Sequence, residues 1–221
     1  KSDLDYIIPT PTNLIIKDGE IQMLNDYSII IDQRFNLSYQ LINSVFDGIV
    51  DISFDTINES INRITIDINE GLDAESYNLR ISDNGIFISS ADNAGALYGL
   101  QSLKQIFLIS KLENTPIKLI EINDSPKFSY RGMLLDISRN FYGPDKIKQI
   151  IDYLSFFKIN HLDFRLTDDE GWRLEIPGLE ELTEVGSKRA YTKDEFESLI
   201  PMYGSGPNIN STGSGYLSRV D

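Results

Sequence analysis

The first 126 residues alternate between short apolar segments and turn residues, a pattern typical of a small α+β domain. Most of these segments are rich in isoleucine, leucine and aromatic residues, which favours strands. Strands are predicted at Tyr6–Thr10, Asn13–Lys17, Glu20–Leu24, Tyr27–Asp32, Arg63–Asn69, Tyr77–Ser82, Ile86–Ser90 and Ile117–Ile122. Two tight turns, Asp18–Gly19 and Asp83–Asn84–Gly85, are predicted to close hairpins between successive strands.

Two helices are predicted within the same 126 residues. Leu37–Phe46 has apolar residues at helical spacing. The second helix begins at Asp92 or Asn93, because either side chain can cap its N-terminus. Its apolar stripe consists of Leu97, Leu100, Leu103 and Phe107. Gly95 and Gly99 lower helix propensity, so we expect them to permit close packing of this helix against a sheet.

After Pro126 the pattern changes to strand, helix, strand. Gly132–Ile137 is apolar, as a buried parallel strand should be, and Gly143–Pro144–Asp145 suits a helix start. His161–Thr167 alternates and predicts the second strand. The buried face of the helix is predicted to contain Ile147, Ile150, Ile151 and Leu154. We therefore place a domain boundary at Pro126, with an α+β domain at 1–126 and a second domain at 127–221.

Charged residues follow both of these strands. Arg139 comes after the first strand, and Asp168, Asp169 and Glu170 come after the second. Parallel α/β sheets build functional sites where their strands end, so this βαβ unit is the predicted centre of the site. The alternation of the second strand also predicts that Asp163 and Arg165 face inward, opposite the apolar Leu162, Phe164 and Leu166.

The chain after Ile176 has no regular apolar pattern. Thr192–Leu199 is predicted as a short helix, capped by Thr192 with Glu195 three residues later. Gly204–Gly215 is rich in glycine, serine and asparagine, which predicts a mobile polar loop without packing contacts.

Composition narrows the possible chemistry. The formal net charge of −14 argues against binding to nucleic acid or to an anionic membrane surface. No apolar run approaches the roughly 18 residues that cross a bilayer, and no signal peptide is visible. The absence of cysteine excludes disulfides and thiolate nucleophiles, and the single histidine, His161, excludes a multi-histidine metal site within this chain. Carboxylate chemistry is what remains.

Two ordered blocks resemble glycoside hydrolase family 20, the β-N-acetylhexosaminidases. They are RGMLLDISRNF at 131–141 and LTDDEGWRLEI at 166–176, and PGLEELTEVG follows at 177–186. Upstream, IIPTP and SYNLRISDNGIFISSADNAGALYGLQSLKQI resemble the small α+β domain that precedes the catalytic barrel in this family. The resemblance runs from about Tyr6 to about Gly186. It implies an α/β fold: the small α+β domain, followed by the first part of a (β/α)₈ barrel.

The resemblance also implies an activity. Family members hydrolyse terminal non-reducing β-linked N-acetylglucosamine or N-acetylgalactosamine with retention, and the 2-acetamido oxygen of the substrate acts as nucleophile. A Glu protonates the leaving oxygen and an adjacent Asp orients the acetamido group, without metal or cofactor. That pair lies in an H-x-G-G-D-E motif, which this chain lacks; Asp194–Glu195 follows the second strand too closely to be it. We expect the pair beyond Asp221, no catalytic residue in this chain, and no hydrolysis by the chain alone.

Chain length leads to the same expectation. A (β/α)₈ barrel needs ~250 residues, whereas about 95 follow Pro126. The chain is therefore expected to be the N-terminal portion of a larger enzyme. Unpaired barrel edges predict instability or self-association of this portion alone. The resemblance further implies a secreted, periplasmic or cell-surface location and a glycan that ends in N-acetylhexosamine as the partner.

Arg139 and Asp168 are the predicted substrate-binding residues. Arg139 matches the family arginine that hydrogen-bonds sugar hydroxyls, a task that suits the fixed fork of a guanidinium. Asp168 matches an aspartate that supports the polar network of the site together with a histidine from the missing part. From chemistry alone, Arg139 could instead form a structural ion pair with Asp136 or Asp168. Likewise, Asp168–Asp169–Glu170 could be a solvated acidic loop or a divalent-cation site, although the family needs no metal.

Neighbouring residues are predicted to shape the site. Asp169 and Glu170 are interpreted as loop-shaping. Trp172 could stack on a sugar ring, but packing that fixes the loop is favoured. His161 and Arg131 lie at the entry of their strands, remote from the active face of a barrel, and are interpreted as structural.

Three positions depart from the family pattern. Asn140 replaces a histidine after the Ser–Arg pair, and Asp163 and Arg165 replace the histidines of H-x-H. The last two could form an ion pair inside the barrel, and all three changes bear on substrate preference. Two alternative functions remain: a related N-acetylglucosaminidase that uses an Asp–Asp pair, and a non-catalytic sugar-binding or structural module.

Overall fold

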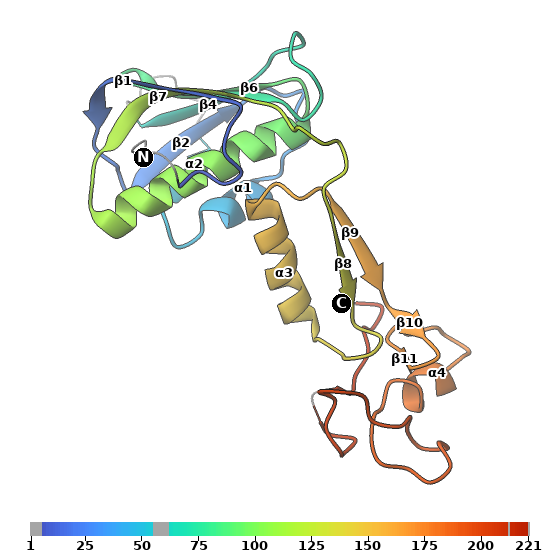
Figure 1. Cartoon of the computed structure of the whole chain (residues 1–221). Coiled ribbons are helices and arrows are strands. Elements are labelled where there is room, and N and C mark those ends of the chain that lie inside the picture. Colours follow the sequence, from blue (N-terminus) through green and yellow to red (C-terminus); the bar gives the residue numbers. More distant parts are fainter. Residues whose placement is uncertain (1–5, 55–61, 212, 221) are drawn as a thin grey trace. The chain divides into compact units, whose positions relative to one another are not determined.

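The computed structural model describes residues 6–54, 62–211 and 213–220. The chain forms two compact units (Figure 1). The first comprises Lys1–Ser129 together with Phe156–Lys158, and the second comprises Tyr130–Ser155 and Ile159–Asp221. Each unit has its own apolar core.

The first unit is built on a seven-stranded mixed sheet with the order β1-β7-β5-β6-β4-β2-β3. The strands are β1 (Asn13–Ile21), β2 (Asp26–Ile31), β3 (Asp51–Phe54), β4 (Arg63–Ile68), β5 (Tyr77–Ser82), β6 (Gly85–Ser90) and β7 (Ile117–Asp124). β6, β4, β2 and β3 run parallel, whereas β5 pairs antiparallel with both β6 and β7. Within β4, β5 and β6 every second side chain enters the core.

Helices α1 (Tyr39–Phe46) and α2 (Asn93–Glu113) pack against this sheet (Figure 1). Both predicted helices are confirmed. The Asp92 side chain caps α2 by accepting a hydrogen bond from the Gly95 backbone N–H at 2.8 Å. The predicted close packing is also confirmed: a Cβ on Gly95 would lie 2.3 Å from the Ser76 carbonyl oxygen, and one on Gly99 would lie 2.7 Å from Ile88.

A buried polar cluster lies at the end of β7 in the first unit. Lys158, which is 5% exposed, donates from Nζ to the Tyr77 hydroxyl at 2.8 Å and to the Asp124 carboxylate at 3.0 Å. The Tyr77 hydroxyl also hydrogen-bonds Ser102 at 2.7 Å. Burial, and secondarily the charge of Asp124, raises the pKa of Tyr77, so this phenol stays protonated. Lys158 is therefore the cation that neutralises the Asp124 carboxylate in this cluster.

Two predicted features at the N-terminus are wrong. Tyr6–Thr10 contains turn and bend residues and a cis Ile8–Pro9 bond instead of a strand. β1 continues through Asp18–Gly19 without turning, because residues on both sides of this dipeptide pair with β7. A register shift between Ile16 and Glu20 absorbs the extra residues, and Gly19 takes a φ of 106° there. Strand β3 was not predicted.

The second unit begins with the predicted βαβ arrangement. β8 (Gly132–Asp136), α3 (Pro144–Phe156) and β9 (His161–Arg165) follow in order, and β8 pairs parallel with β9. The hairpin of β10 (Thr167–Asp168) and β11 (Gly171–Trp172) and the short α4 (Glu181–Glu184) come next. The predicted packing of Leu162, Phe164 and Leu166 is confirmed, because they contact the core cluster of Leu135, Ile137 and Ile147. Asp163 and Arg165 are exposed.

The helix α3 buries less of its surface than predicted. Ile147 is buried and Ile150 packs against the core, but Ile151 is 45% exposed. The two strands β8 and β9 offer the helix only a narrow apolar surface. The predicted helix at Thr192–Leu199 is wrong as well. Thr192 does accept a hydrogen bond from the Glu195 backbone at 3.1 Å, but Glu195 takes a φ of 59°, which ends the helical turn.

Candidate functional site

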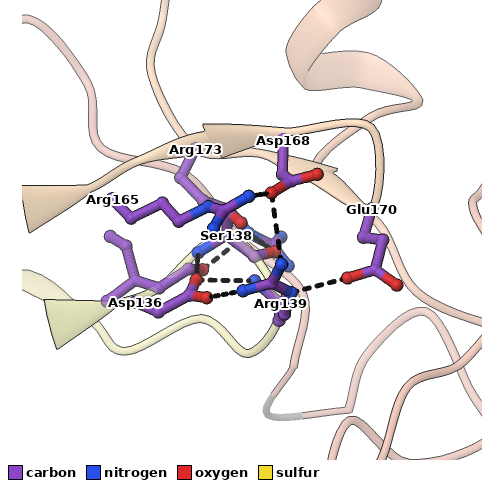
Figure 2. A network of polar contacts seen from close by, with 8 residues as sticks. Asp136, Ser138, Arg139, Arg165, Asp168, Glu170 and Arg173 are labelled. Atoms are coloured by element: carbon purple, nitrogen blue, oxygen red, sulfur yellow. Dashed lines mark hydrogen bonds and ion pairs between the residues drawn. The ribbon is translucent and has the colours of Figure 1, made fainter.

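The ends of β8 and β9 bring the predicted charged residues together. Asp136 is the last residue of β8 and pairs in register with Arg165, the last residue of β9. Beyond β9, the hairpin β10–β11 carries Asp168 and Glu170 toward Arg139 (Figure 2). Parallel pairing therefore places the ends of both strands, and the charges that follow them, at one edge of the sheet.

Arg139 is the centre of this cluster. Its Nε donates to Glu170 at 2.7 Å, its Nη1 contacts Asp136, and its Nη2 lies 3.5 Å from Asp168 (Figure 2). Among the described residues these contacts use three of the five guanidinium N–H donors, which leaves one N–H on each terminal nitrogen. The side chain is 43% exposed, so the guanidinium is accessible to a ligand. The hydrogen bonds that Arg139 donates to Glu170 and Asp136 outweigh desolvation and raise the pKa of Arg139.

Asp136 anchors both the backbone and the side chain of Arg139. Its Oδ1 accepts from the Ser138 N–H at 3.0 Å and from the Arg139 N–H at 3.3 Å, and its Oδ2 pairs with the guanidinium. Partial burial opposes ionisation of Asp136, but the hydrogen bonds from Arg139 and Ser138 outweigh it, so the pKa of this carboxyl lies below its usual value.

The lowered pKa of Asp136 predicts that part of the stability of the fold is lost at acid pH. A carboxyl with a lowered folded-state pKa stabilises the fold above its unfolded-state pKa, about 3.9, and loses that contribution as the pH falls through the folded-state value. Urea unfolding should therefore show wild type more stable than Asp136→Asn at pH 6, with the difference shrinking below about pH 4. In an Arg139→Ala background the pH-dependent difference should become smaller. A difference that is the same at pH 6 and pH 2.5 would contradict the assignment.

Asp163 and Arg165 do not form the ion pair considered for them. Arg165 pairs with Asp168, three residues later, so Asp168 receives guanidinium groups from two arginines (Figure 2). Asp163 instead accepts a 3.4 Å hydrogen bond from the Tyr130 hydroxyl. The structural ion pairs weighed for Arg139, to Asp136 and to Asp168, are both present.

The remaining predicted residues lie around this cluster. The Trp172 indole donates to the Leu174 carbonyl at 2.7 Å, a contact that fits its interpretation as loop packing. Asp169 is exposed in the turn between β10 and β11. Glu170 was predicted only to shape the loop, yet it contacts Arg139 directly. His161 hydrogen-bonds Asn160 at 2.7 Å, at the opposite end of β9 from the cluster.

Sequence reasoning missed Arg173, which is fully buried directly behind the cluster. It donates six hydrogen bonds of 2.6 to 3.1 Å, all to backbone carbonyl oxygens. The accepting residues are Ile137, Ser138, Ser187, Gly213 and Gly215. Burial lowers the pKa of Arg173 to about 10, so the group is still cationic at neutral pH. Its place after Gly–Trp in a motif that resembles a family pattern is the one signal that could have identified it.

These contacts also correct the prediction for Gly204–Gly215. Thr212 lies outside the described residues, and residues 207–210 are exposed, but Ser205 and Gly213 are buried in the unit. Ser205 is fully buried and hydrogen-bonds Met202, while Gly213 and Gly215 turn their carbonyls to Arg173. Its glycines and serines permit close backbone approach, since a Cβ on Gly213 would lie 2.3 Å from Ser205.

The described residues include no group of three or more His, Cys, Asp or Glu side chains placed to hold a metal ion. The carboxylates of the cluster are directed at arginines instead. In the same part of the chain, no helix combines the length and apolar character needed to cross a membrane.

Comparison with known proteins identifies the class and then the family. Residues 5–125 match the model described as glycosyl hydrolase family 20, domain 2, and residues 128–221 match glycosyl hydrolase family 20, catalytic domain. The matches place the protein among the glycosyl hydrolases. The chain belongs to glycosyl hydrolase family 20, as its motifs indicate, with domain 2 followed by the start of the catalytic domain.

Relatives and solved structures agree with this assignment. The chain is 34% identical to a β-hexosaminidase of Vibrio vulnificus, covering 98% of this chain and 25% of the relative. It is 36% identical to an N,N'-diacetylchitobiase of Vibrio harveyi, covering 97% and 24%. An exo-β-N-acetylglucosaminidase of V. harveyi, solved with N-acetylglucosamine, superposes with a TM-score of 0.81 at 25% identity, covering 98% of this chain and 33% of that one. The chain thus spans about a quarter of these relatives and a third of the solved structure.

Proposed function

We propose that this chain belongs to an enzyme that removes terminal β-linked N-acetylhexosamine from glycans, and that it supplies part of the sugar-binding site. The observation that carries this proposal is Arg139, partly exposed at the ends of β8 and β9, with two N–H donors left after its ion pairs. Its support is the family membership and the relative that was solved with N-acetylglucosamine.

The cluster has the chemistry that a sugar requires. Adjacent hydroxyls of a pyranose both accept and donate hydrogen bonds. The two remaining donors of Arg139 can meet two hydroxyl oxygens, while Asp168 and Glu170 can accept from the hydroxyl protons. The three carboxylates around Arg139 hold its guanidinium in place before a ligand arrives, which reduces the entropy lost on binding.

Catalysis in this proposal follows the substrate-assisted retaining mechanism. The 2-acetamido oxygen of the sugar attacks the anomeric carbon, a Glu protonates the leaving oxygen, and water then opens the cyclic intermediate. The Asp–Glu pair is assigned to residues beyond Asp221, so Arg139 and Asp168 act in binding. We also propose that the enzyme works outside the cytoplasm, where such glycans are met.

The test uses the full-length gene product that contains this chain. Turnover of chromogenic N-acetylglucosaminide and N-acetylgalactosaminide is expected. Arg139→Ala should lower kcat/KM about 100-fold, the loss expected for two hydrogen bonds from a charged donor. Arg80→Ala is the matched control, because Arg80 contacts the Phe87 ring on the sheet of the first unit. Loss of activity in both variants alike, or in neither, would contradict the role of Arg139.

The isolated chain of 221 residues should behave differently. It should bind N-acetylglucosamine weakly at most and hydrolyse nothing, and its exposed Leu134 and Ile151 should promote self-association, which light scattering would detect. Hydrolysis by the isolated chain would overturn the assignment of the Asp–Glu pair to residues beyond Asp221.

A further inference from the structure

We propose that Arg173 is a positioning residue that sets the direction of the Arg139 side chain and thereby the affinity of the site for N-acetylhexosamine. The inference rests on the proposed function, in which Arg139 contacts the sugar. What carries it is the peptide group between Ser138 and Arg139, which is held at both edges.

The carbonyl edge of this peptide group is held by Arg173. The Ser138 oxygen accepts from Arg173 Nε at 3.1 Å and from Nη2 at 2.9 Å. The preceding carbonyl, that of Ile137, accepts from the same Nε at 3.0 Å. One planar guanidinium therefore orients the two peptide groups that lead from the end of β8 to Arg139.

The N–H edge is held by Asp136, whose Oδ1 accepts from the Arg139 N–H at 3.3 Å. The backbone of β11 lies against the carbonyl edge, because a Cβ on Gly171 would be 2.2 Å from the Ser138 oxygen. The peptide plane is thus confined at both edges. Any rotation of it would swing the Arg139 head group, which sits at the far end of a long side chain.

Arg173 can act as a fixed support because it is itself immobilised. Its Nη1 donates to the carbonyls of Ser187 at 2.6 Å and Gly215 at 3.0 Å, and its Nη2 donates to Gly213 at 3.0 Å. The Phe141 ring lies 5.7 Å from the guanidinium carbon. The position of Arg139 is thereby tied to backbone between 187 and 215, far along the sequence.

A double-mutant cycle in the full-length gene product tests the proposal. Arg173→Lys keeps the charge, but a single ammonium group cannot reproduce the planar fork that bonds Ile137 and Ser138. We expect this variant to raise the Kd for N-acetylglucosamine and the KM about 10-fold, with a smaller change in kcat. In an Arg139→Ala background, where no guanidinium remains to be positioned, the same change should alter the Kd less than about twofold.

The control is Arg189→Lys. Arg189 is also buried in this unit, but its guanidinium bonds the Ile200 carbonyl and not the backbone at 137–139. This variant should leave the Kd within about twofold of wild type even where its Tm falls.

The possible outcomes distinguish the positioning role of Arg173 from the sugar-binding role of Arg139. An equal rise in Kd on Arg173→Lys with and without Arg139 would overturn the positioning role and leave the proposed function intact. No effect of Arg139→Ala on Kd or kcat/KM would overturn the proposed role of Arg139 itself. Should Arg173→Lys fail to fold by circular dichroism, Gly171→Ala, which displaces the Ser138 carbonyl and keeps the cation, replaces it in the same cycle.

Discussion

Replacement of Arg173 by methionine is expected to destabilise the second unit by about 3–5 kcal/mol, because several backbone carbonyls lose their donor at about 1–3 kcal/mol each. The lost interactions are six hydrogen bonds to five backbone carbonyls. One of these carbonyls, that of Ser187, also accepts from the Gly215 N–H. Burial of the cation opposes this loss, since methionine has no desolvation cost. The net change in the free energy of unfolding is still a loss, because each carbonyl left without a partner costs about 1–3 kcal/mol.

Arg189→Met is the matched comparison and should be nearly neutral or stabilising. Arg189 is 1% exposed, and its Nη1 donates to the Ile200 carbonyl at 2.8 Å. Its Nε and Nη2 are buried without a hydrogen-bond partner among the described residues. Removing a poorly satisfied buried charge recovers its desolvation cost. Urea unfolding of both variants measures the contrast. Equal losses of stability in the two variants would show that the hydrogen bonds from Arg173 to backbone carbonyls do not account for its contribution to stability.

Lys158→Met should cost the first unit about 3–5 kcal/mol, because it leaves the Asp124 carboxylate partly buried without its cation. Asp124 would keep its hydrogen bonds from Thr12, which carry no charge, and Tyr77 would lose a donor. The double variant Lys158→Met/Asp124→Asn should recover much of the loss, because the unpaired charge is then absent. If the double variant is as unstable as the two single changes added together, the ion pair does not explain the cost.

Elements set by local pattern could be predicted from the sequence. α2 was identified by its apolar stripe and its Asp92 cap, and the βαβ unit by two strands around a helix that starts at Pro144. The error at β1 has a cause that no local pattern contains, which is pairing over long sequence distance. The Asp18–Gly19 dipeptide favours a hairpin locally, but the continuous partner strand β7 keeps β1 extended.

The residues of the candidate site also differ in whether a local pattern could predict them. Arg139 and Asp168 could be chosen because they follow strands and match the family pattern, and their roles in sugar binding stay predictions. Glu170 and Arg173 depend on the β10–β11 hairpin folding back onto Ser138, and no local pattern encodes that contact. The burial of Arg173 was also not expected from its residue type, since arginine is rarely fully buried unless paired.

The membership of residues 156–158 in the first unit has a consequence for biosynthesis. A ribosome releases the chain from its N-terminus, and domains generally fold as they emerge. Here the seven strands of the first sheet are complete at Asp124, but the lysine that neutralises Asp124 is translated more than thirty residues later. During synthesis the Asp124 carboxylate of the first unit therefore lacks its cation at first. The ion pair with Lys158 can form only after β8 and α3 have been made.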